Sequence, residues 1–302
     1  MRLLSRIERV TLVIAAVGTV LSAVLKFGHA NVVLAFIVSG LVLGVQAALV
    51  GQATEQLGSR LGPGATGVLQ SALGNLPELF FGIFALRAGL ITVVQATIVG
   101  SILGNNLLVL GLAFIVGGLR HGTQKFRSEP PKLIATLMLL AVSALVVPTL
   151  VQELHTPAAR HAEELSVACS LVLLIVFGLS IPLSLSGAPV AVPSPEHDPE
   201  EIHHDAWPLW MAATILTVAS VGSAFVSSWF VDALGPAIVR LHLSEAFTGL
   251  VIVAIVGNAV ENVVGIQLAA RDKMDYAISV ILNSPLQIAL GLAPALVLLS
   301  FV

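Results

Sequence analysis

The chain has 302 residues, of which 57% are apolar and only 10% charged, and its mean hydropathy is +0.99. This balance excludes an ordinary soluble domain and indicates a protein of the lipid bilayer. The net charge of −3 provides no basic face for nucleic acid, and the lone Cys169 excludes an internal disulfide or a cysteine-based metal cluster.

Apolar stretches long enough to cross a bilayer recur along the chain. A spanning helix needs about 20 predominantly apolar residues, and such windows alternate here with short polar interruptions. The expected spans are residues 10–25, 31–50, 66–86, 91–117, 132–151, 164–185, 208–231, 245–270 and 276–301. The predicted fold class is therefore an all-α polytopic membrane protein with about nine spans.

The N-terminal region, residues 1–30, is interpreted as an extra span that precedes the rest of the fold. Arg2, Arg6 and Arg9 before an apolar run would also suit a secretory signal peptide. With the N-terminus in the cytoplasm, ten of the 14 lysines and arginines fall in inside segments, as the positive-inside rule predicts. We therefore expect an integral protein of a prokaryotic cytoplasmic (inner) membrane, with its N-terminus in the cytoplasm.

Residues 187–206 form the longest polar stretch and are expected to be a cytoplasmic linker. Four prolines disfavour a packed helix there, and the stretch also carries five acidic residues and three histidines. These charges are either simply solvated or form a low-affinity segment that senses cations. The linker separates two larger parts, residues 31–186 and 207–302.

These two parts contain an internal repeat at an offset of 183 residues. The segment Leu73–Glu78 aligns with Val256–Glu261, and Gly82-Ile83 aligns with Gly265-Ile266. The spans 31–50 and 208–231 occupy corresponding places in the two copies. From span 31–50 through span 164–185 the chain is expected to cross the membrane five times, and because this number is odd, the second copy is predicted to be inverted. In inverted repeats, substrate sites form near the bilayer midplane where the copies meet, on helices interrupted by glycine or proline. Gly74, Pro77 and Gly257 are expected to be such interruptions.

Each copy of the repeat carries a glutamate within a span, Glu78 in the first and Glu261 in the second. A charged residue at the centre of a spanning helix costs about 2.5–3.5 kcal/mol, so duplicated acids suggest one shared use. The alternative is a pair of protonated or hydrogen-bonded acids that hold helices together. Asn75 and Asn258 stand three residues before these acids, on the same helix face.

Carboxylates flanked by amide oxygens are the hard ligands that Ca²⁺ prefers, and two carboxylates neutralise a divalent ion. When the ion leaves, two like charges in a low-dielectric site favour proton uptake. The motif therefore predicts exchange of a metal cation for protons, with Glu78 and Glu261 as the metal-binding and proton-accepting residues.

Polar residues on the helices that follow each motif are expected to add ligands. Ser101 and Ser284 are related by the same offset, and Asn105 and Gln287 lie close to them in sequence. The alternative is that these side chains only hydrogen-bond between helices. The chain has no His-Glu-x-x-His motif and no Gly-x-Ser-x-Gly motif in a polar surrounding, so we expect no enzyme, no catalytic residue and no resident cofactor.

These motifs resemble the cation/Ca²⁺ antiporter superfamily and, within it, the Ca²⁺/H⁺ exchangers. The resemblance extends over about residues 31–290 and is carried by residues 51–57, 74–79, 93–111, 257–261, 273–275 and 287–290. It implies that Glu78 and Glu261 bind the cation and accept protons, that Asn75 and Asn258 add ligands, and that residues 187–206 correspond to an acidic linker. The asparagine after the motif glycine favours the proton-coupled branch over Na⁺/Ca²⁺ exchangers, which typically carry threonine there.

Three features depart from the family pattern. Asn262 stands where the family commonly has histidine, and the second Gly-Ser element reads Asn283-Ser284-Pro285. Only 15 residues follow Gln287, so the second repeat is expected to be short at the C-terminus and to lack two peripheral helices.

The predicted function is secondary active exchange of Ca²⁺ for H⁺ by alternating access in a lipid bilayer. One alternative is a Na⁺-coupled or broad-specificity divalent cation exchanger. Another is a passive channel or an inactive truncated homologue. The sequence leaves open the choice between Ca²⁺ and Mn²⁺ and the oligomeric state.

Overall fold

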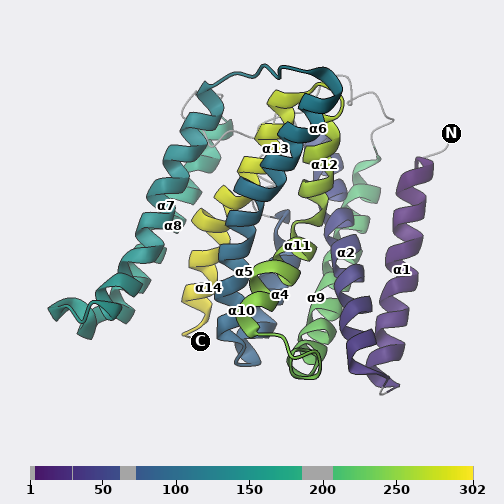
Figure 1. Cartoon of the computed structure of the whole chain (residues 1–302). Helices are drawn as coiled ribbons and strands as arrows, with labels where there is room; N and C mark the ends of the chain where they lie inside the picture. The colour runs from purple at the N-terminus through teal and green to yellow at the C-terminus, as the bar shows by residue number, and fades with distance from the viewer. Residues whose placement is uncertain (1–3, 29, 62–72, 186–206, 302) are drawn as a thin grey trace. The chain divides into compact units, whose positions relative to one another are not determined.

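The computed structural model describes residues 4–28, 30–61, 73–185 and 207–301, and every regular element in these ranges is a helix (Figure 1). This confirms the predicted all-α class. Helices are the expected solution for such apolar segments, because lipid offers backbone N–H and C=O groups no other hydrogen-bond partner.

Seven helices of the described ranges are long and apolar enough to cross a membrane. They are Arg6–Phe27, Val32–Gly58, Ile91–His121, Glu129–Glu153, Pro157–Ser180, Leu209–Arg240 and Met274–Leu299. An eighth span results if Glu245–Gly257 and Glu261–Ala269 are counted as one broken helix. The predicted span 66–86 begins outside the described residues, so the count of nine stays a prediction.

The helices form two compact units, and each unit draws on both halves of the chain. Unit 1 comprises Met1–Ser101 and His197–Val260, and unit 2 comprises Ile102–Glu196 and Glu261–Val302. The predicted division into 1–30, 31–186, 187–206 and 207–302 follows sequence repeats rather than contacts, and it stays a prediction. The linker of residues 187–206 lies outside the described residues.

Unit 1 is built around α2 (Val32–Leu61) and α9 (Leu209–Arg240), which lie side by side and form its most extensive contact (Figure 1). Phe230 of α9 stacks on Phe36 of α2 with ring centroids 5.1 Å apart. The helix α1 (Arg6–Phe27) packs on α2. The other elements of unit 1 are α4 (Leu76–Arg87), most of α5 (Ile91–Leu103), α10 (Glu245–Phe247), η4 (Thr248–Val253) and α11 (Ala254–Gly257).

The helix α2 extends beyond the apolar stretch that predicted it. The expected span ended at residue 50, whereas the helix ends at Leu61. Ala53 and Thr54 are fully buried in this extension, while Glu55 on the same turn is exposed. The extension is therefore amphipathic, and packing in unit 1 rather than uniform hydrophobicity keeps it helical.

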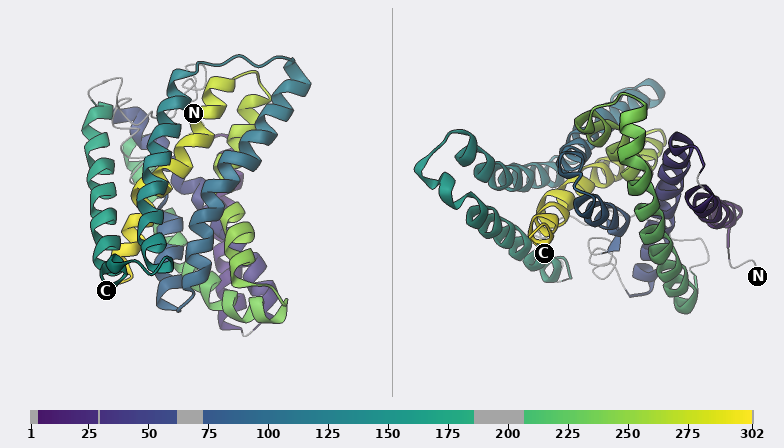
Figure 2. Two further views of the ribbon diagram at one scale, coloured as in Figure 1. Left: turned by 60° about the vertical axis from the view of Figure 1, so that its left-hand side comes forward. Right: turned by 90° about the horizontal axis from the view of Figure 1, so that it is seen from below.

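Unit 2 contains an antiparallel pair, α7 (Glu129–Glu153) and α8 (Ala162–Leu185), which run side by side and are joined by the short helix η2 (Pro157–His161) (Figures 1 and 2). The helix α13 (Met274–Gln287) packs against α7 and is among the most buried of the unit. The other elements are η1 (Gly104–Val109), α6 (Leu110–His121), most of α12 (Ala259–Ala269), η5 (Ile288–Leu292) and α14 (Ala293–Leu299).

Local backbone conformation repeats at the same offset of 183 residues as the sequence. Asn75 has φ −96° and ψ 18°, and Asn258 has φ −95° and ψ 18°. Gly89 and its counterpart Asp272 both have a positive φ, of 75° and 63°. The π-helical segments η1 and η5 also begin within one residue of corresponding positions. The repeat is therefore one of local structure as well as of residue identity.

Candidate functional site

Each motif glutamate lies in the first turn of a helix that begins after a backbone break. Asn75 precedes α4, whose first turn holds Glu78 and has Pro77 near its start, where a missing N–H costs nothing. Asn258 ends α11, and Glu261 lies in the first turn of α12. The sequence predicted interruptions at the neighbouring Gly74, Pro77 and Gly257. A helix N-terminus favours negative charge, so both acids occupy positions suited to a carboxylate.

In unit 1, the side chain of Glu78 packs against the second motif. A Cβ added to Gly257 would lie 3.5 Å from Cγ and 3.6 Å from Oε1 of Glu78. The next residue, Asn258, is 2% exposed and donates from Nδ2 to Ser101 Oγ at 2.8 Å and to the Ala254 carbonyl at 2.9 Å. We call Glu78, Gly257, Asn258 and Ser101 the Glu78 cluster.

The two donated bonds of Asn258 determine how its amide can be used. A side-chain amide has two N–H donors and one carbonyl oxygen, and both donors have acceptors in unit 1. The carbonyl oxygen is thus the atom with which Asn258 can coordinate a cation. This orientation fits the role of ligand that the sequence predicted for Asn258.

A close backbone crossing positions Ser101 in the Glu78 cluster. A Cβ on the preceding Gly100 would lie only 2.1 Å from the Leu250 carbonyl oxygen, and one on Gly249 would lie 2.4 Å from the Val93 carbonyl oxygen. Only glycine permits α5 and η4 to approach this closely. The glycine of the Gly100-Ser101 pair therefore has a packing role distinct from the hydrogen bond of the serine.

Ser227 of α9 also reaches this region, although the sequence gave no reason to select it. It is fully buried and donates from Oγ to the Pro77 carbonyl at 3.4 Å. Ser227 lies outside the repeated motif, and a serine in an apolar helix is too common to be informative. Its contact links α9 to the turn that carries Glu78.

In unit 2, the packing of α12 on α13 predicts that Glu261 lies level with a second pair of polar side chains. Gly265 of α12 packs against Ile281 of α13. Because these helices are antiparallel and joined by a short turn, the contact of Gly265 predicts that Glu261, one turn earlier, is level with Ser284. Asn105 donates from Nδ2 to Ser284 Oγ at 3.3 Å. We call Glu261, Asn105, Ser284 and the buried Gln287 the Glu261 cluster.

Four buried side-chain oxygens of unit 2 accept no hydrogen bond from the described residues: Gln124 Oε1, Glu261 Oε2, Asn262 Oδ1 and Asn283 Oδ1. Asn283 uses its Nδ2 on the carbonyl and hydroxyl of Ser279, at 2.8 and 3.2 Å. Buried acceptors normally have partners, and carboxylate and amide oxygens are suited to a hard cation. Asn283 and Asn262 were not predicted as ligands, although both interrupt apolar sequence.

All eight predicted site residues lie in the described ranges, distributed over the two units. Ser101 and Asn258 join Glu78 in unit 1, where Asn75 is partly buried at the start of α4. Asn105, Ser284 and Gln287 belong to unit 2 with Glu261 and are 2%, 6% and 7% exposed. Among the described residues, no group of three or more histidine, cysteine, aspartate or glutamate side chains could hold a metal ion.

The chain matches one protein family and is similar to several known proteins. The profile of the family described as "Sodium/calcium exchanger protein" matches residues 31–185 and 210–301. The chain is similar to a protein named Ca(2+)/H(+) antiporter from Aphanothece halophytica, with 36% identity over 91% of this chain and 77% of that protein. It is also similar to the Ca(2+)/H(+) antiporter ChaA of Bacillus subtilis, with 32% identity over 97% of this chain and 84% of that protein.

A solved structure described as native YfkE resembles the fold of this chain. The TM-score is 0.78 at 30% sequence identity, and the match covers 97% of this chain and 82% of the other.

Proposed function

The chain belongs to the sodium/calcium exchanger protein family, and on that premise we propose that it exchanges Ca²⁺ for H⁺ across a membrane by alternating access. It is an integral membrane transporter and not an enzyme. The relatives named Ca(2+)/H(+) antiporters support the choice of the two exchanged ions.

One observation carries the proposal: each unit contains a glutamate of the repeated motif and a buried hydrogen bond from an asparagine to a serine, and in unit 1 the glutamate packs against the residue before that asparagine. Glu78 and Glu261 bind the cation and accept protons. The additional ligands are Asn75, Asn258, Ser101, Asn105, Ser284 and Gln287. Two carboxylates balance the charge of one Ca²⁺, and amide and hydroxyl oxygens complete a hard-ligand set.

The membrane surroundings of these acids couple the two ions. An ionised carboxylate within a bilayer is costly unless a cation neutralises it. Either Ca²⁺ or protons can do so, so occupancy by one ion opposes occupancy by the other. This competition, repeated on both sides of the membrane, is sufficient for exchange.

The proposal includes an inverted repeat of 31–186 and 207–302 with about nine spans and an N-terminal extra span. The repeated backbone conformations at Asn75 and Asn258 support the repeat, and the distribution of lysine and arginine supports a cytoplasmic N-terminus in a prokaryotic inner membrane. Labelling of single cysteines in a Cys169→Ser background tests the topology. A cysteine at Arg160 that reacts from the cytoplasm would contradict it.

The test of function is Ca²⁺ uptake by proteoliposomes under an imposed pH gradient. The parent should accumulate Ca²⁺ and dissipate the pH gradient. Glu78→Gln and Glu261→Gln should each reduce uptake to background, because each removes a ligand and half of the neutralising charge. The loss should exceed the roughly 10–100-fold cost of removing an outer partner of a metal site.

Glu245→Gln is the matched control, since Glu245 is an exposed carboxylate in the first turn of α10. It should transport at the parent rate, and all variants should elute as the parent does in size-exclusion chromatography. Parent-like uptake by either Glu78→Gln or Glu261→Gln would contradict the assignment of the site.

A Na⁺-coupled exchanger is the second candidate, because the family description names sodium. Uptake driven by a Na⁺ gradient in the absence of a pH gradient would favour it. Ca²⁺ flow without movement of either counter-ion would indicate a passive channel and contradict both.

A further inference from the structure

In unit 2, two loops far apart in sequence are joined at one end of the helices. The first connects α6 to α7, and the second connects α12 to α13 (Figure 1). Nε2 of His121 lies 2.9 Å from the Ala270 carbonyl oxygen, and the Arg127 backbone N–H donates to Asp275 Oδ1 at 2.7 Å. The loops therefore form one continuous surface, which we call the basic surface and define as residues 120–132 and 270–275.

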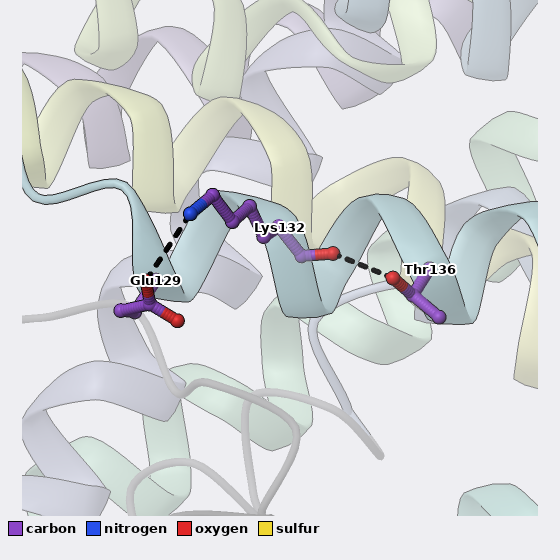
Figure 3. A network of polar contacts seen from close by, with 3 residues as sticks. All are labelled: Glu129, Lys132 and Thr136. Carbon is purple, nitrogen blue, oxygen red and sulfur yellow. Dashed lines mark hydrogen bonds and ion pairs between the residues drawn. The ribbon is translucent and has the colours of Figure 1, made fainter.

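The basic surface has an excess of positive charge. Its six cations are Arg120, Lys125, Arg127, Lys132, Arg271 and Lys273, and its three carboxylates are Glu129, Asp272 and Asp275. Lys132 pairs with Glu129 at 3.2 Å (Figure 3). Arg120 and Lys125 are exposed and form no ion pair with any described residue. They can therefore interact with an external anion.

The opposite end of α7 has the opposite charge. Between α7 and the start of α8, Glu153, Glu163 and Glu164 accompany a single cation, Arg160. The excess of cations is thus confined to one end of this helix pair. A uniform requirement for solubility would not separate charges by sign along one helix.

Apolar side chains are exposed within the basic surface and directly beside it. Leu119 is 84% exposed and Phe126 is 41% exposed, and the ring of Phe126 lies 5.8 Å from that of Phe114 on α6. Exposed leucine and phenylalanine beside lysine and arginine at the end of a spanning helix are typical of a membrane interface. The apolar groups suit acyl chains, and the cations suit headgroup phosphates.

We propose that the basic surface binds the headgroups of anionic phospholipids in the leaflet where α6 ends and α7 begins. Arg120 and Lys125 would contact the phosphates, while Phe126 enters the acyl boundary. The hydrogen bonds from His121 and Arg127 hold the two loops together, so both can contact the same lipid layer. The binding does not depend on the ion that the protein transports.

The test measures the selectivity of the reconstituted full chain for spin-labelled phosphatidylglycerol over spin-labelled phosphatidylcholine by electron paramagnetic resonance. The parent should prefer phosphatidylglycerol by about threefold or more, as expected for several juxtamembrane cations near an anionic leaflet. The Arg120→Gln/Lys125→Gln double variant should show a ratio near one. The double variant Arg120→Lys/Lys125→Arg should retain the preference.

Arg160→Gln is the matched control, because it removes an exposed cation from the other end of the helix pair. It should keep the parent ratio. Equal ratios for the parent and for Arg120→Gln/Lys125→Gln would overturn the proposal. So would loss of the preference on adding inorganic phosphate but not chloride of equal ionic strength, which would identify a site for free phosphate instead.

Discussion

In the Glu78 cluster of unit 1, Ser101 accepts a hydrogen bond from Asn258, the asparagine of the second motif, at 2.8 Å. In the Glu261 cluster of unit 2, the corresponding Ser284 accepts from Asn105 at 3.3 Å. Asn105 lies outside the repeated Gly-Asn-x-x-Glu motif, and its counterpart at the offset of 183 is the apolar Ile288. The same type of side-chain pair thus joins corresponding serines to asparagines from unrelated positions.

The two copies of the repeat thus share some structural properties and differ in others. Backbone conformation is nearly identical at Asn75 and Asn258, whereas the hydrogen bonds around the two acids differ. The duplicated element is therefore a broken helix with a glutamate in its first turn, and the asparagine–serine hydrogen bonds of the two units are not duplicated. Substitution of corresponding residues should have unequal effects.

The largest expected difference is at Gly100, whose counterpart is Asn283. Gly100→Ala places a Cβ against the Leu250 carbonyl oxygen, which is backbone and cannot turn aside. We expect a loss of stability of about 3 kcal/mol, at the upper end for overpacking, measured as the midpoint of thermal inactivation in detergent. Gly104→Ala, one turn later and with no atom within 4 Å of the added Cβ, should be neutral. Equal midpoints for Gly100→Ala and Gly104→Ala would show that the close approach of Gly100 to Leu250 does not limit the stability of unit 1.

The next largest effect concerns the Asn258–Ser101 pair. A double-mutant cycle with Asn258→Ala and Ser101→Ala should give a coupling free energy of about 1 kcal/mol, within the range for hydrogen bonds between membrane helices. The measurement is reversible unfolding in mixed micelles, and Ser170→Ala serves as a buried serine outside both clusters. A coupling indistinguishable from zero would mean that this bond does not stabilise unit 1.

The corresponding cycle in unit 2, Asn105→Ala with Ser284→Ala, should give about half that coupling. The bond is longer, and hydrogen bonds weaken as the donor–acceptor distance grows. Unfolding under the same conditions allows direct comparison of the two values. A larger coupling in unit 2 than in unit 1 would reverse the order that the distances imply.

The smallest effect should come from the ion pair between Lys26 and Asp232 of unit 1. Its distance is only 2.7 Å, shorter than either bond above, but the side chains are 37% and 49% exposed. We expect Asp232→Asn to change stability by about 0.5 kcal/mol or less, with the difference vanishing at high salt. A larger loss of stability that does not depend on salt would show that the short distance of this ion pair determines its contribution more than its exposure to solvent does.

Much of the fold could be predicted from the sequence because lipid imposes a simple rule on helices. Apolar runs predicted the seven described spans, and the repeat predicted breaks close to Asn75 and Asn258. The end of α2 at Leu61 was missed, because the residues after 50 are polar on one face and only the packed structure shows the buried face. The π-helical segments η1, η4 and η5 have no comparable signal in composition or periodicity.

The residues of the candidate site could be selected from the sequence, but the hydrogen bonds that they form could not. Glu78 and Glu261 were identifiable because a duplicated acid in an apolar span is costly and therefore rare. Hydrogen bonds such as that from Asn258 to Ser101 join residues 157 positions apart, and no local pattern encodes that proximity. The same reason hid Ser227, whose relation to Pro77 depends on the packing of α9.

Each unit combines helices from both halves of the chain, and this arrangement affects the order in which the protein is inserted and folded. Unit 1 requires α9, which is synthesised only after the linker, so α1, α2 and α4 enter the membrane before their main packing partner exists. The early helices must persist in lipid as independent spans, as their own backbone hydrogen bonds allow. The buried Gln46 of α2 fits this order, since its Nε2 donates at 2.8 Å to Thr19 of α1, which emerges from the ribosome first. A nascent chain that stops before residue 207 would contain several inserted helices but neither finished unit.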